Sequence, residues 1–295
     1  MIQIGNCKIG LGQPTYVILE VARTYNGISE FEDMVAYASS QGVNAIKIQT
    51  IFVDELMQTK NISQKSQKYQ NHAKYLQTLE KTLEEHQKLQ QICHKYDVEF
   101  LSTPEGFRAL DLLEELDVPA YKISSLNLPY TALLIEIARK NKPIILSTGM
   151  GTIDEITNAL VTLRILNTQI VLMHCSSLYP TPSNKANLNN IKLLQKFNNI
   201  VGYSDHTIGT LAPILAVTLG AKVIEKHYTR DRNQDGADHK VAVDYPMLKQ
   251  MMSQIRETAE MLGYTQRILS PEELTVKYIK RRKYTDGQYL QTQVM

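Results

Sequence analysis

Residues 201–231 read VGYSDHTIGTLAPILAVTLGAKVIEKHYTRD, and this stretch decides the fold. A short apolar run at 199–203 is followed by a helical pattern at 208–219, which Gly220 ends, and by a second apolar run at 222–227. The pattern predicts a strand, a helix and a strand. The two strands of such a unit are parallel, so their carboxyl ends emerge on the same side.

Two histidines lie at these strand ends. His206 follows the first strand and His227 ends the second, so we expect them to converge despite their separation in the sequence. Alternation along a strand places Ser204 on the face of His206, and it places Glu225 on the face of His227. Two imidazoles beside a carboxylate suit a divalent metal, with Glu225 as a ligand or as a partner that orients a histidine. A helix cap and a packed histidine are the structural alternative.

Working outward, the same pattern recurs along the chain. The sequence predicts eight strands, each followed by a helix, which begin at Tyr16, Val43, Val98, Ala120, Pro143, Ile170, Asn199 and Lys222. This is the pattern of an α/β protein with a (β/α)8 TIM barrel. The regular spacing argues against a doubly wound open sheet, and the sequence contains no GxGxxG or P-loop motif.

Two segments lie outside the repeat. Residues 2–13 alternate around Gly5-Asn6, which predicts a short N-terminal β-hairpin that closes the bottom of the barrel. Residues 51–78 are polar and lack an obvious pattern, so we expect a lid or binding loop, or a partly disordered connection. The expected domains are a barrel with its hairpin at 1–265 and a tail or linker remnant at 266–295.

Composition and charge argue against several classes of protein. The 295 residues are 43% hydrophobic, enough for a large core, and the net charge is +2. We therefore expect neither nucleic acid nor an anionic membrane as a partner, and we interpret the basic run at 277–283 as a solvated linker. Scattered cysteines without a CxxC pair, and no pattern of a signal peptide or membrane span, predict a cytoplasmic protein.

Polar residues gather at the predicted carboxyl ends of the strands, where barrels place their chemistry. A charged side chain inside a buried strand is rarely structural unless it is paired. The group comprises Glu20, Lys47, Gln49, Thr103, Lys122, Ser125, Ser204, His206, Glu225 and His227. Because unrelated core residues would not collect at one end of successive strands, we interpret the group as one active site.

These residue types suit a particular chemistry. Lys47 and Lys122, with hydroxyl donors beside them, can bind a small polyanion such as a phosphate that also bears a carboxylate. A metal bound by histidine polarises a carbonyl oxygen, and Glu20 can move protons or position water. Together they indicate carbon–carbon bond formation between a phosphorylated enol and an aldehyde. A Schiff-base aldolase is the other barrel chemistry, but no lysine stands out as its nucleophile.

Several ordered motifs carry a resemblance to a known family. They are FLSTP (100–104), PAYKISS (119–125), KPIILSTGM (142–150), LMHCSSLYPTP (172–182), GYSDHTIG (202–209), VIEKHYT (223–229) and GADH (236–239). Over residues 5–261 the chain resembles the sialic acid synthase family, whose members condense phosphoenolpyruvate (PEP) with N-acetylmannosamine or related acetamido sugars. The resemblance implies a transferase that makes a sialic-acid-type 2-keto-3-deoxy sugar acid and phosphate. In the family's mechanism C3 of PEP attacks the aldehyde, water adds at C2, and phosphate leaves by C–O cleavage.

The resemblance also implies roles for single residues. His206 and His227 would bind Mn²⁺ or Mg²⁺, and Glu20 would assist proton transfer or water attack. The PEP pocket would be lined by Lys47, Thr103, Lys122, Ser125, Tyr179 and Ser204. Four further residues would bind the sugar or orient the metal ligands: Gln49, Ser177, Glu225 and Asp238.

Three features differ from the family pattern. Residues 20–27 read EVARTYNG where the family usually reads EIGINHNG, so Thr24 and Tyr25 replace an Asn-His pair. Ser177 stands where the family usually has the asparagine of an NxYPTP segment. Residues 270–295 resemble only the start of the connection to the antifreeze-like domain of most members. A catalytically impaired binding or scaffold barrel and a metal-assisted pyruvate aldolase are therefore kept as alternative functions. The partner state to test is a homodimer.

Overall fold

A computed structural model describes the chain except for residues 58–64, 167–168, 264–267, 281–282, 286–287 and 291–295. Contacts divide the chain into two compact units, Met1–Glu260 and Met261–Met295. The second unit contains helix α12 (Pro271–Lys280) and an antiparallel pair of strands, β11 (Lys283–Thr285) and β12 (Gln288–Leu290). The domain limits that the sequence predicts at 265 and 266 stay predictions.

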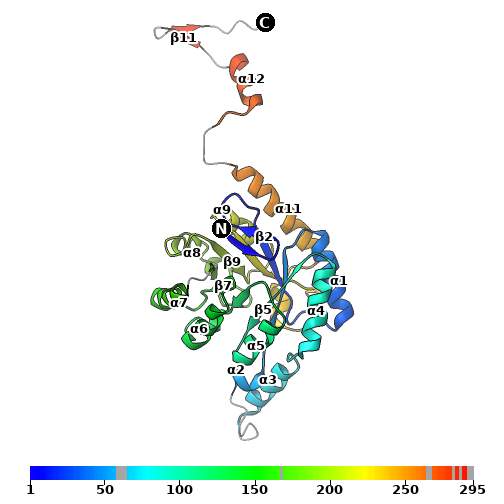
Figure 1. Ribbon diagram of the computed structural model, residues 1–295. Helices are drawn as coiled ribbons and strands as arrows, with labels where there is room; N and C mark the ends of the chain where they lie inside the picture. The colour runs from blue at the N-terminus through cyan, green and yellow to red at the C-terminus, as the bar shows by residue number, and fades with distance from the viewer. Residues whose placement is uncertain (58–64, 167–168, 264–267, 281–282, 286–287, 291–295) are drawn as a thin grey trace. The chain divides into compact units, whose positions relative to one another are not determined.

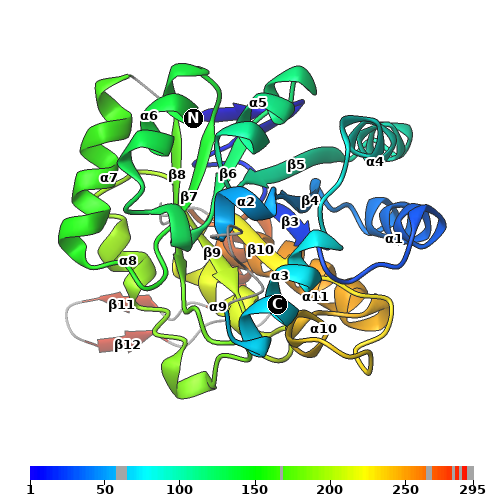
Figure 2. The same cartoon turned by 90° about the horizontal axis from the view of Figure 1, so that it is seen from below.

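The first unit is a closed barrel of parallel strands in the order β10-β3-β4-β5-β6-β7-β8-β9, which confirms the predicted (β/α)8 fold. The strands are β3 (Tyr16–Glu20), β4 (Ala45–Thr50), β5 (Glu99–Pro104), β6 (Tyr121–Ile123), β7 (Ile144–Ser147), β8 (Ile170–Cys175), β9 (Val201–Asp205) and β10 (Val223–His227). In Figure 2 these strands lie at the centre and the helices surround them. Each strand predicted from the sequence overlaps one of the observed strands.

The helices follow the strands in the expected alternation (Figure 1). They are α1 (Ile28–Ser40), α2 (Val53–Leu56), α3 (Gln67–Gln77), α4 (Leu83–Lys95), α5 (Phe107–Glu115), α6 (Thr131–Arg139), α7 (Ile153–Ile165), α8 (Asn190–Leu194), α9 (Leu211–Thr218), α10 (Ala237–Val241) and α11 (Tyr245–Leu262), with 3₁₀ turns at Ser125–Asn127 and Ser183–Lys185. Capping boxes begin α4 at Thr82 and α7 at Thr152. Gly42 and Gly220 follow the ends of α1 and α9 at positive φ of 76° and 99°, where a side chain would be strained.

The N-terminal hairpin closes the amino end of the barrel, as the sequence predicts. Strands β1 (Ile2–Ile4) and β2 (Cys7–Ile9) pair in antiparallel register. Their buried side chains, including Ile4 and Ile9, form one apolar cluster with inward residues of the barrel strands such as Ile18 and Leu101. In Figure 1 the hairpin lies at the end of the barrel opposite to α2 and α3. This end is therefore packed with apolar side chains, and the polar residues are left to the other end.

Residues 51–78 were expected to form a lid or binding loop, or a partly disordered connection, but the described part of this segment contains the regular helices α2 and α3. Residues 58–64 of that segment lie outside the described residues. Ala73 and Leu76 of α3 pack against Ile51 and Val53 in a small apolar cluster beside the main core. This contact is tertiary, so the local sequence, which is rich in polar residues, carries little sign of it.

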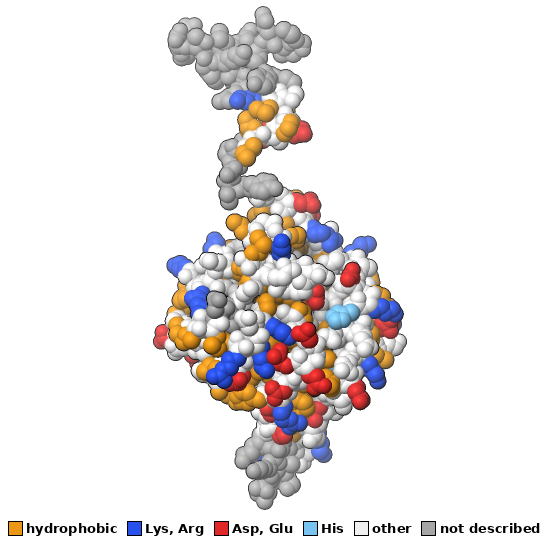
Figure 3. Space-filling model, in the orientation of Figure 1, with side chains coloured by type: hydrophobic (Ala, Val, Ile, Leu, Met, Phe, Trp, Pro, Cys, Tyr) orange, Lys and Arg blue, Asp and Glu red, His pale blue; other side chains and the backbone are white. Residues whose placement is uncertain are grey.

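Among the described residues no helix has the length and apolar content needed to cross a lipid bilayer. On the face drawn in Figure 3, acidic and basic side chains are interspersed around the barrel unit rather than gathered by sign. That distribution agrees with the near-balanced charge of the sequence.

Candidate active site

The carboxyl ends of the barrel strands enclose a cavity of about 610 Å³. All the site residues predicted from the sequence line it: Glu20, Lys47, Gln49, Thr103, Lys122, Ser125, Ser177, Tyr179, Ser204, His206, Glu225, His227 and Asp238. Parallel register explains the convergence, because Glu20 lies opposite Lys47 on one side and His227 on the other. The structure thus brings these residues together, while the role of each stays a prediction.

Lys47 is a buried cation on β4. Its ammonium group donates to the Glu20 carboxylate and, at 3.4 Å, to Thr103 Oγ1. Burial raises the pKa of Glu20, and Lys47 offsets this only in part. Burial acts to lower the pKa of Lys47, but Glu20 and Glu225 together raise it above its ordinary value. Lys47 is therefore charged, whereas Glu20 takes up a proton more readily than an exposed carboxylate does.

Lys122 on β6 is the second buried cation. It donates to Ser147 Oγ at 2.6 Å, and its Nζ lies 3.7 Å from Glu225 Oε2. Burial lowers the pKa of Lys122. Burial acts to raise the pKa of Glu225, but Lys122 and Lys47 outweigh it and lower that pKa. Glu225 is therefore ionised. Its Oε1 accepts from Ser204 Oγ at 3.0 Å, and its Oε2 has no hydrogen-bond partner among the described residues.

His206 and His227 face each other with ring centroids 5.5 Å apart. Nδ1 of His206 lies 2.8 Å from the carbonyl oxygen of Ser176. Because a carbonyl can only accept, this Nδ1 carries the proton and Nε2 keeps its lone pair. Burial lowers the pKa of His206 and lowers that of His227 well below its ordinary value, so both rings are neutral at physiological pH.

The side-chain chemistry of the histidine pair suits a divalent metal ion. Neutral imidazole is the form that binds metals, and the buried Nδ1 of His227 has no hydrogen-bond partner among the described residues. Asp238 Oδ2 lies 3.8 Å from that nitrogen. In the described part of the chain, no three His, Cys, Asp or Glu side chains are grouped closely enough to hold an ion by themselves. Substrate and water would therefore supply the remaining ligands.

Several polar residues of the cavity escaped the sequence interpretation, among them Glu105, Ser147 and Arg23. Glu105 is buried and accepts from Asn127 Nδ2 at 2.7 Å, and burial raises its pKa. Ser147 ends β7 and accepts a hydrogen bond from Lys122. A search for polar residues at the carboxyl ends of the strands would have found it. Arg23 lies beyond β3 in an irregular segment, where no periodic signal points to it.

The chain is similar to several known proteins. The model of the NeuB family matches residues 34–267. An uncharacterized protein of Methanocaldococcus jannaschii is 40% identical over 98% of this chain and 86% of its own length. The N,N'-diacetyllegionaminic acid synthase of Legionella pneumophila is 33% identical over 94% of this chain and 81% of its own.

A solved structure extends the likeness to the fold. The N-acetylneuraminic acid (sialic acid) synthetase of Leptospira borgpetersenii superimposes with a TM-score of 0.84 at 29% identity. The match covers 96% of this chain and 98% of that chain. From the family model and the curated synthases it matches, this chain belongs to the NeuB family of sialic acid synthase-like transferases, enzymes that form carbon–carbon bonds.

Proposed function

We propose that this enzyme condenses PEP with an N-acetylmannosamine-like acetamido sugar aldehyde in a reaction that requires Mn²⁺ or Mg²⁺. The products are a sialic-acid-type 2-keto-3-deoxy sugar acid and inorganic phosphate. One observation carries the proposal: two buried lysines with hydroxyl partners share a cavity with a pair of buried histidines. Relatives named as legionaminic acid and pseudaminic acid synthases support the same class of product.

The lysine side of the cavity suits the donor. PEP carries a phosphate and a carboxylate, and Lys47 and Lys122 offer two buried ammonium groups to pair with them. Burial raises the pKa of both Glu20 and Glu105, and a bound anion raises each further. Protonation of these carboxyl groups on binding removes the negative charge that would otherwise repel PEP.

The histidine side suits the acceptor. His206 and His227 would hold the ion, which polarises the aldehyde oxygen when bound. C3 of PEP forms the new bond to the aldehyde carbon, and the aldehyde oxygen takes a proton. Water then adds at C2, and the C–O bond to phosphate breaks to leave a ketone and inorganic phosphate. In this proposal Glu20, protonated when PEP binds, gives its proton to the aldehyde oxygen and then, as a carboxylate, takes the proton of that water.

The test is phosphate release from PEP with a panel of acetamido sugars, with and without a chelator. Release should require both a sugar and the ion. His227→Ala should lower kcat at least about 100-fold, because a bound ion supplies several kcal/mol of transition-state stabilisation, and it should lose retained metal. His94→Ala, an exposed histidine on α4, is the matched control and should retain both properties. Full activity in the presence of chelator, or in His227→Ala, would show the metal assignment to be wrong.

Other measurements separate the alternatives. A barrel that only binds or scaffolds should show no metal-linked PEP binding by calorimetry. A metal-assisted pyruvate aldolase should exchange the methyl protons of pyruvate without any phosphate chemistry. The cytoplasmic location and the homodimer stay predictions, and fractionation of cells and light scattering of the purified chain test them.

A further inference from the structure

Three buried glutamates line the candidate site, and they differ in their cationic partners. Glu20 pairs with Lys47, and Glu225 Oε2 lies 3.7 Å from Lys122 Nζ. Glu105, which is 8% exposed, has no basic side chain within ion-pair distance in the described part of the chain. Both buried lysines are thus engaged by other carboxylates. Of the three glutamates, Glu105 is the one whose ionisation a neighbouring charge compensates least.

The Glu105 carboxyl group is held by one of its two oxygens. Oε2 accepts from Asn127 Nδ2 at 2.7 Å and from Ser124 Oγ at 3.3 Å. The backbone nitrogen of Glu105 donates to the carbonyl oxygen of Thr50 at 3.1 Å, which fixes the chain after β5 against β4. Oε1 has no hydrogen-bond partner among the described residues and, unlike Glu225 Oε2, is not fully enclosed by protein. Because Glu105 lines the cavity, Oε1 is the oxygen that a ligand can reach.

This arrangement decides where a proton binds on Glu105. An ionised carboxylate can only accept hydrogen bonds, whereas a protonated carboxyl group gains one donor. Since two donors already occupy Oε2, the proton of neutral Glu105 belongs on Oε1. The neutral acid therefore presents a hydroxyl donor to the cavity, where the ionised form would present a negative charge.

The surroundings of Glu105 favour the neutral form. Burial raises its pKa and outweighs Lys47, the two hydrogen bonds and Lys122, which act to lower it. Glu55 on α2 is the nearby carboxylate outside the cavity, and its Oε1 accepts from the backbone nitrogen of Arg108 at 3.0 Å. When PEP pairs with the two lysines, its negative charge offsets their attraction for an ionised Glu105. The other charged or titratable side chains of the cavity are Glu20, Arg23, His72, Cys175, Tyr179, His206, Glu225, His227 and Asp238.

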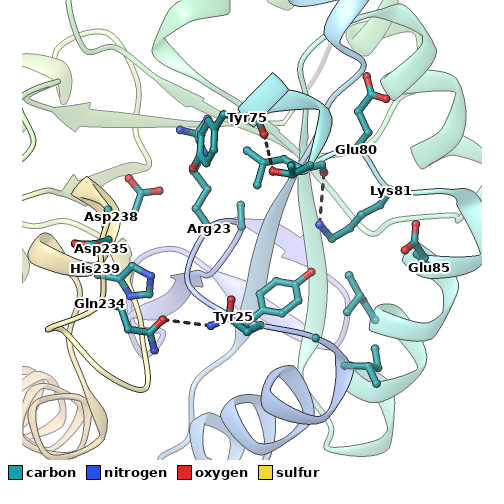
Figure 4. Close-up of a pocket in the computed structure, with 18 of the residues that line it drawn as sticks. Arg23, Tyr25, Tyr75, Glu80, Lys81, Glu85, Gln234, Asp235, Asp238 and His239 are labelled. Carbon is teal, nitrogen blue, oxygen red and sulfur yellow. Dashed lines mark hydrogen bonds between the residues drawn. The ribbon is translucent and has the colours of Figure 1, made fainter. Parts of the chain in front are cut away.

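A second cavity, of about 1280 Å³, lies beside the candidate site and shares Asp238 with it (Figure 4). Its glutamates are held by backbone groups. Glu80 Oε1 accepts from the backbone nitrogen of Val53 at 2.5 Å, and Glu85 Oε2 accepts from that of Thr82 at 2.7 Å in the capping box of α4. These two glutamates do not line the candidate site. A proton taken up together with PEP is therefore expected on the carboxyl groups of the candidate site itself.

We propose that Glu105 binds PEP as a neutral acid, taking up a proton on Oε1 and donating it in a hydrogen bond to an anionic oxygen of the ligand. The proton comes from solvent, and no covalent bond of PEP changes in this step. The inference rests on the proposed function, because it takes the lysine side of the cavity as the PEP site. Glu105 directly follows FLSTP (100–104) and lies outside the motifs that carry the family resemblance, so this role does not come from that resemblance.

Calorimetry of PEP binding to the full chain with Mg²⁺ tests the inference. Titrations in buffers of different ionisation enthalpy give the number of protons taken up. Wild type should take up about one more proton per PEP than Glu105→Gln, whose amide keeps the acceptor for Asn127 and places a neutral donor in the cavity. Because binding then requires one proton more, the affinity of wild type should fall more steeply with rising pH than that of the variant.

Two further variants separate the hydrogen bond from other effects. Glu105→Ala lacks the donor and should bind PEP about threefold or more weakly than Glu105→Gln does. Glu115→Gln removes an exposed carboxyl group on α5 and is the matched control, which should keep the proton uptake and the affinity of wild type. Urea denaturation of each variant checks that it is folded.

Three results would overturn the inference: equal proton uptake by wild type and Glu105→Gln, PEP affinity more than about tenfold weaker in Glu105→Gln than in wild type, or equal affinity of Glu105→Gln and Glu105→Ala. Phosphate release from PEP with the sugar panel tests the proposed function separately. Release by an enzyme whose proton uptake does not depend on Glu105 disproves only this inference. The expected proton uptake without phosphate release from any acceptor disproves only the catalytic proposal.

Discussion

Lys226 lies between Glu225 and His227 on β10, but its side chain points away from the cavity and is fully buried in an ion pair. Its Nζ is 2.6 Å from Asp205 Oδ2 and donates to the carbonyl oxygen of Thr207 at 2.5 Å. Asp205 Oδ1 accepts from the backbone nitrogen of Thr207. Because His206 lies between Asp205 and Thr207, this pair holds the turn that presents the histidine to the site.

Replacing Lys226 by Met should lower the free energy of unfolding by about 3–5 kcal/mol, because Asp205 would remain as an unpaired buried charge. Urea denaturation measures the change. The control Lys249→Met, at an exposed position of α11, should shift the same quantity by no more than about 0.5 kcal/mol. Combining Lys226→Met with Asp205→Leu should restore part of the loss, since neither charge is then left alone. A Lys226→Met protein as stable as the wild type would contradict this account.

At the scale of elements, α5, β6 and the end of α6 meet at Glu114. Its Oε1 accepts from the Tyr121 hydroxyl at 2.6 Å and lies 3.3 Å from Lys142 Nζ, and its Oε2 lies 3.3 Å from Lys140 Nζ. Burial acts to raise the pKa of Glu114, but these partners outweigh it and lower the pKa below its ordinary value. A carboxyl whose pKa is depressed by folding stabilises the protein above its unfolded pKa. That contribution is lost as the pH falls through the folded pKa.

Glu114→Gln should therefore lower the free energy of unfolding at neutral pH, by about 1 kcal/mol or less because the group is partly solvated. The difference from the wild type should shrink as the pH falls below about 4.3, the pKa of glutamate in an unfolded chain. Denaturation curves recorded from about pH 3 to about pH 7 measure this difference, because the range brackets the titration of a glutamate carboxyl group. Glu115→Gln, an exposed neighbour on α5, serves as the control. A difference that is constant over this range would rule out the ionised network as its source.

The elements also show what the sequence could predict. The barrel strands are continuous apolar runs because helices cover one face and the barrel interior the other, so periodicity and spacing predicted them. Residues 67–77 were missed because α3 is mostly polar and depends on Ala73 and Leu76 packing against Ile51 and Val53. That contact joins segments apart in the sequence, and only the folded chain supplies it.

At the scale of the whole molecule, the apolar cluster under the hairpin and the polar candidate site lie at opposite ends of the barrel. Ile4 of the hairpin is fully buried in the amino-end cluster. Ile4→Ala should lower the free energy of unfolding by about 2–5 kcal/mol, because it leaves a cavity among apolar side chains. The KM for PEP should not change while the barrel stays folded, since the site lies at the other end. Denaturation and steady-state kinetics check the two halves of this prediction.

The matched control is Leu11→Ala, which removes an apolar side chain that is 88% exposed and should leave stability nearly unchanged. A rise in KM for Ile4→Ala at a temperature where it is fully folded would show that the two ends are coupled.

Some residues of the candidate site could be predicted from the sequence, and others could not. Glu20, Lys47 and His227 were found because parallel strands bring their carboxyl ends together whatever the loops do. Arg23 was missed because its place depends on how the segment after β3 folds across the cavity mouth, which no local pattern encodes. The identities of the metal ion, the donor and the acceptor stay proposals, because each depends on how several side chains act together.

The candidate site and the cavity beside it are lined by different kinds of segment, and this affects which parts of the sequence can change. The lysines that face the proposed donor sit on β4 and β6, inside the barrel wall, where a substitution disturbs neighbouring strands. The second cavity, which shares Arg23, Ala237 and Asp238 with the candidate site, is built largely from connecting segments and the helices that follow them. The sequence of residues 22–28, 75–88 and 234–239 can therefore change with less disturbance of the barrel than the sequence of the strands that carry the lysines.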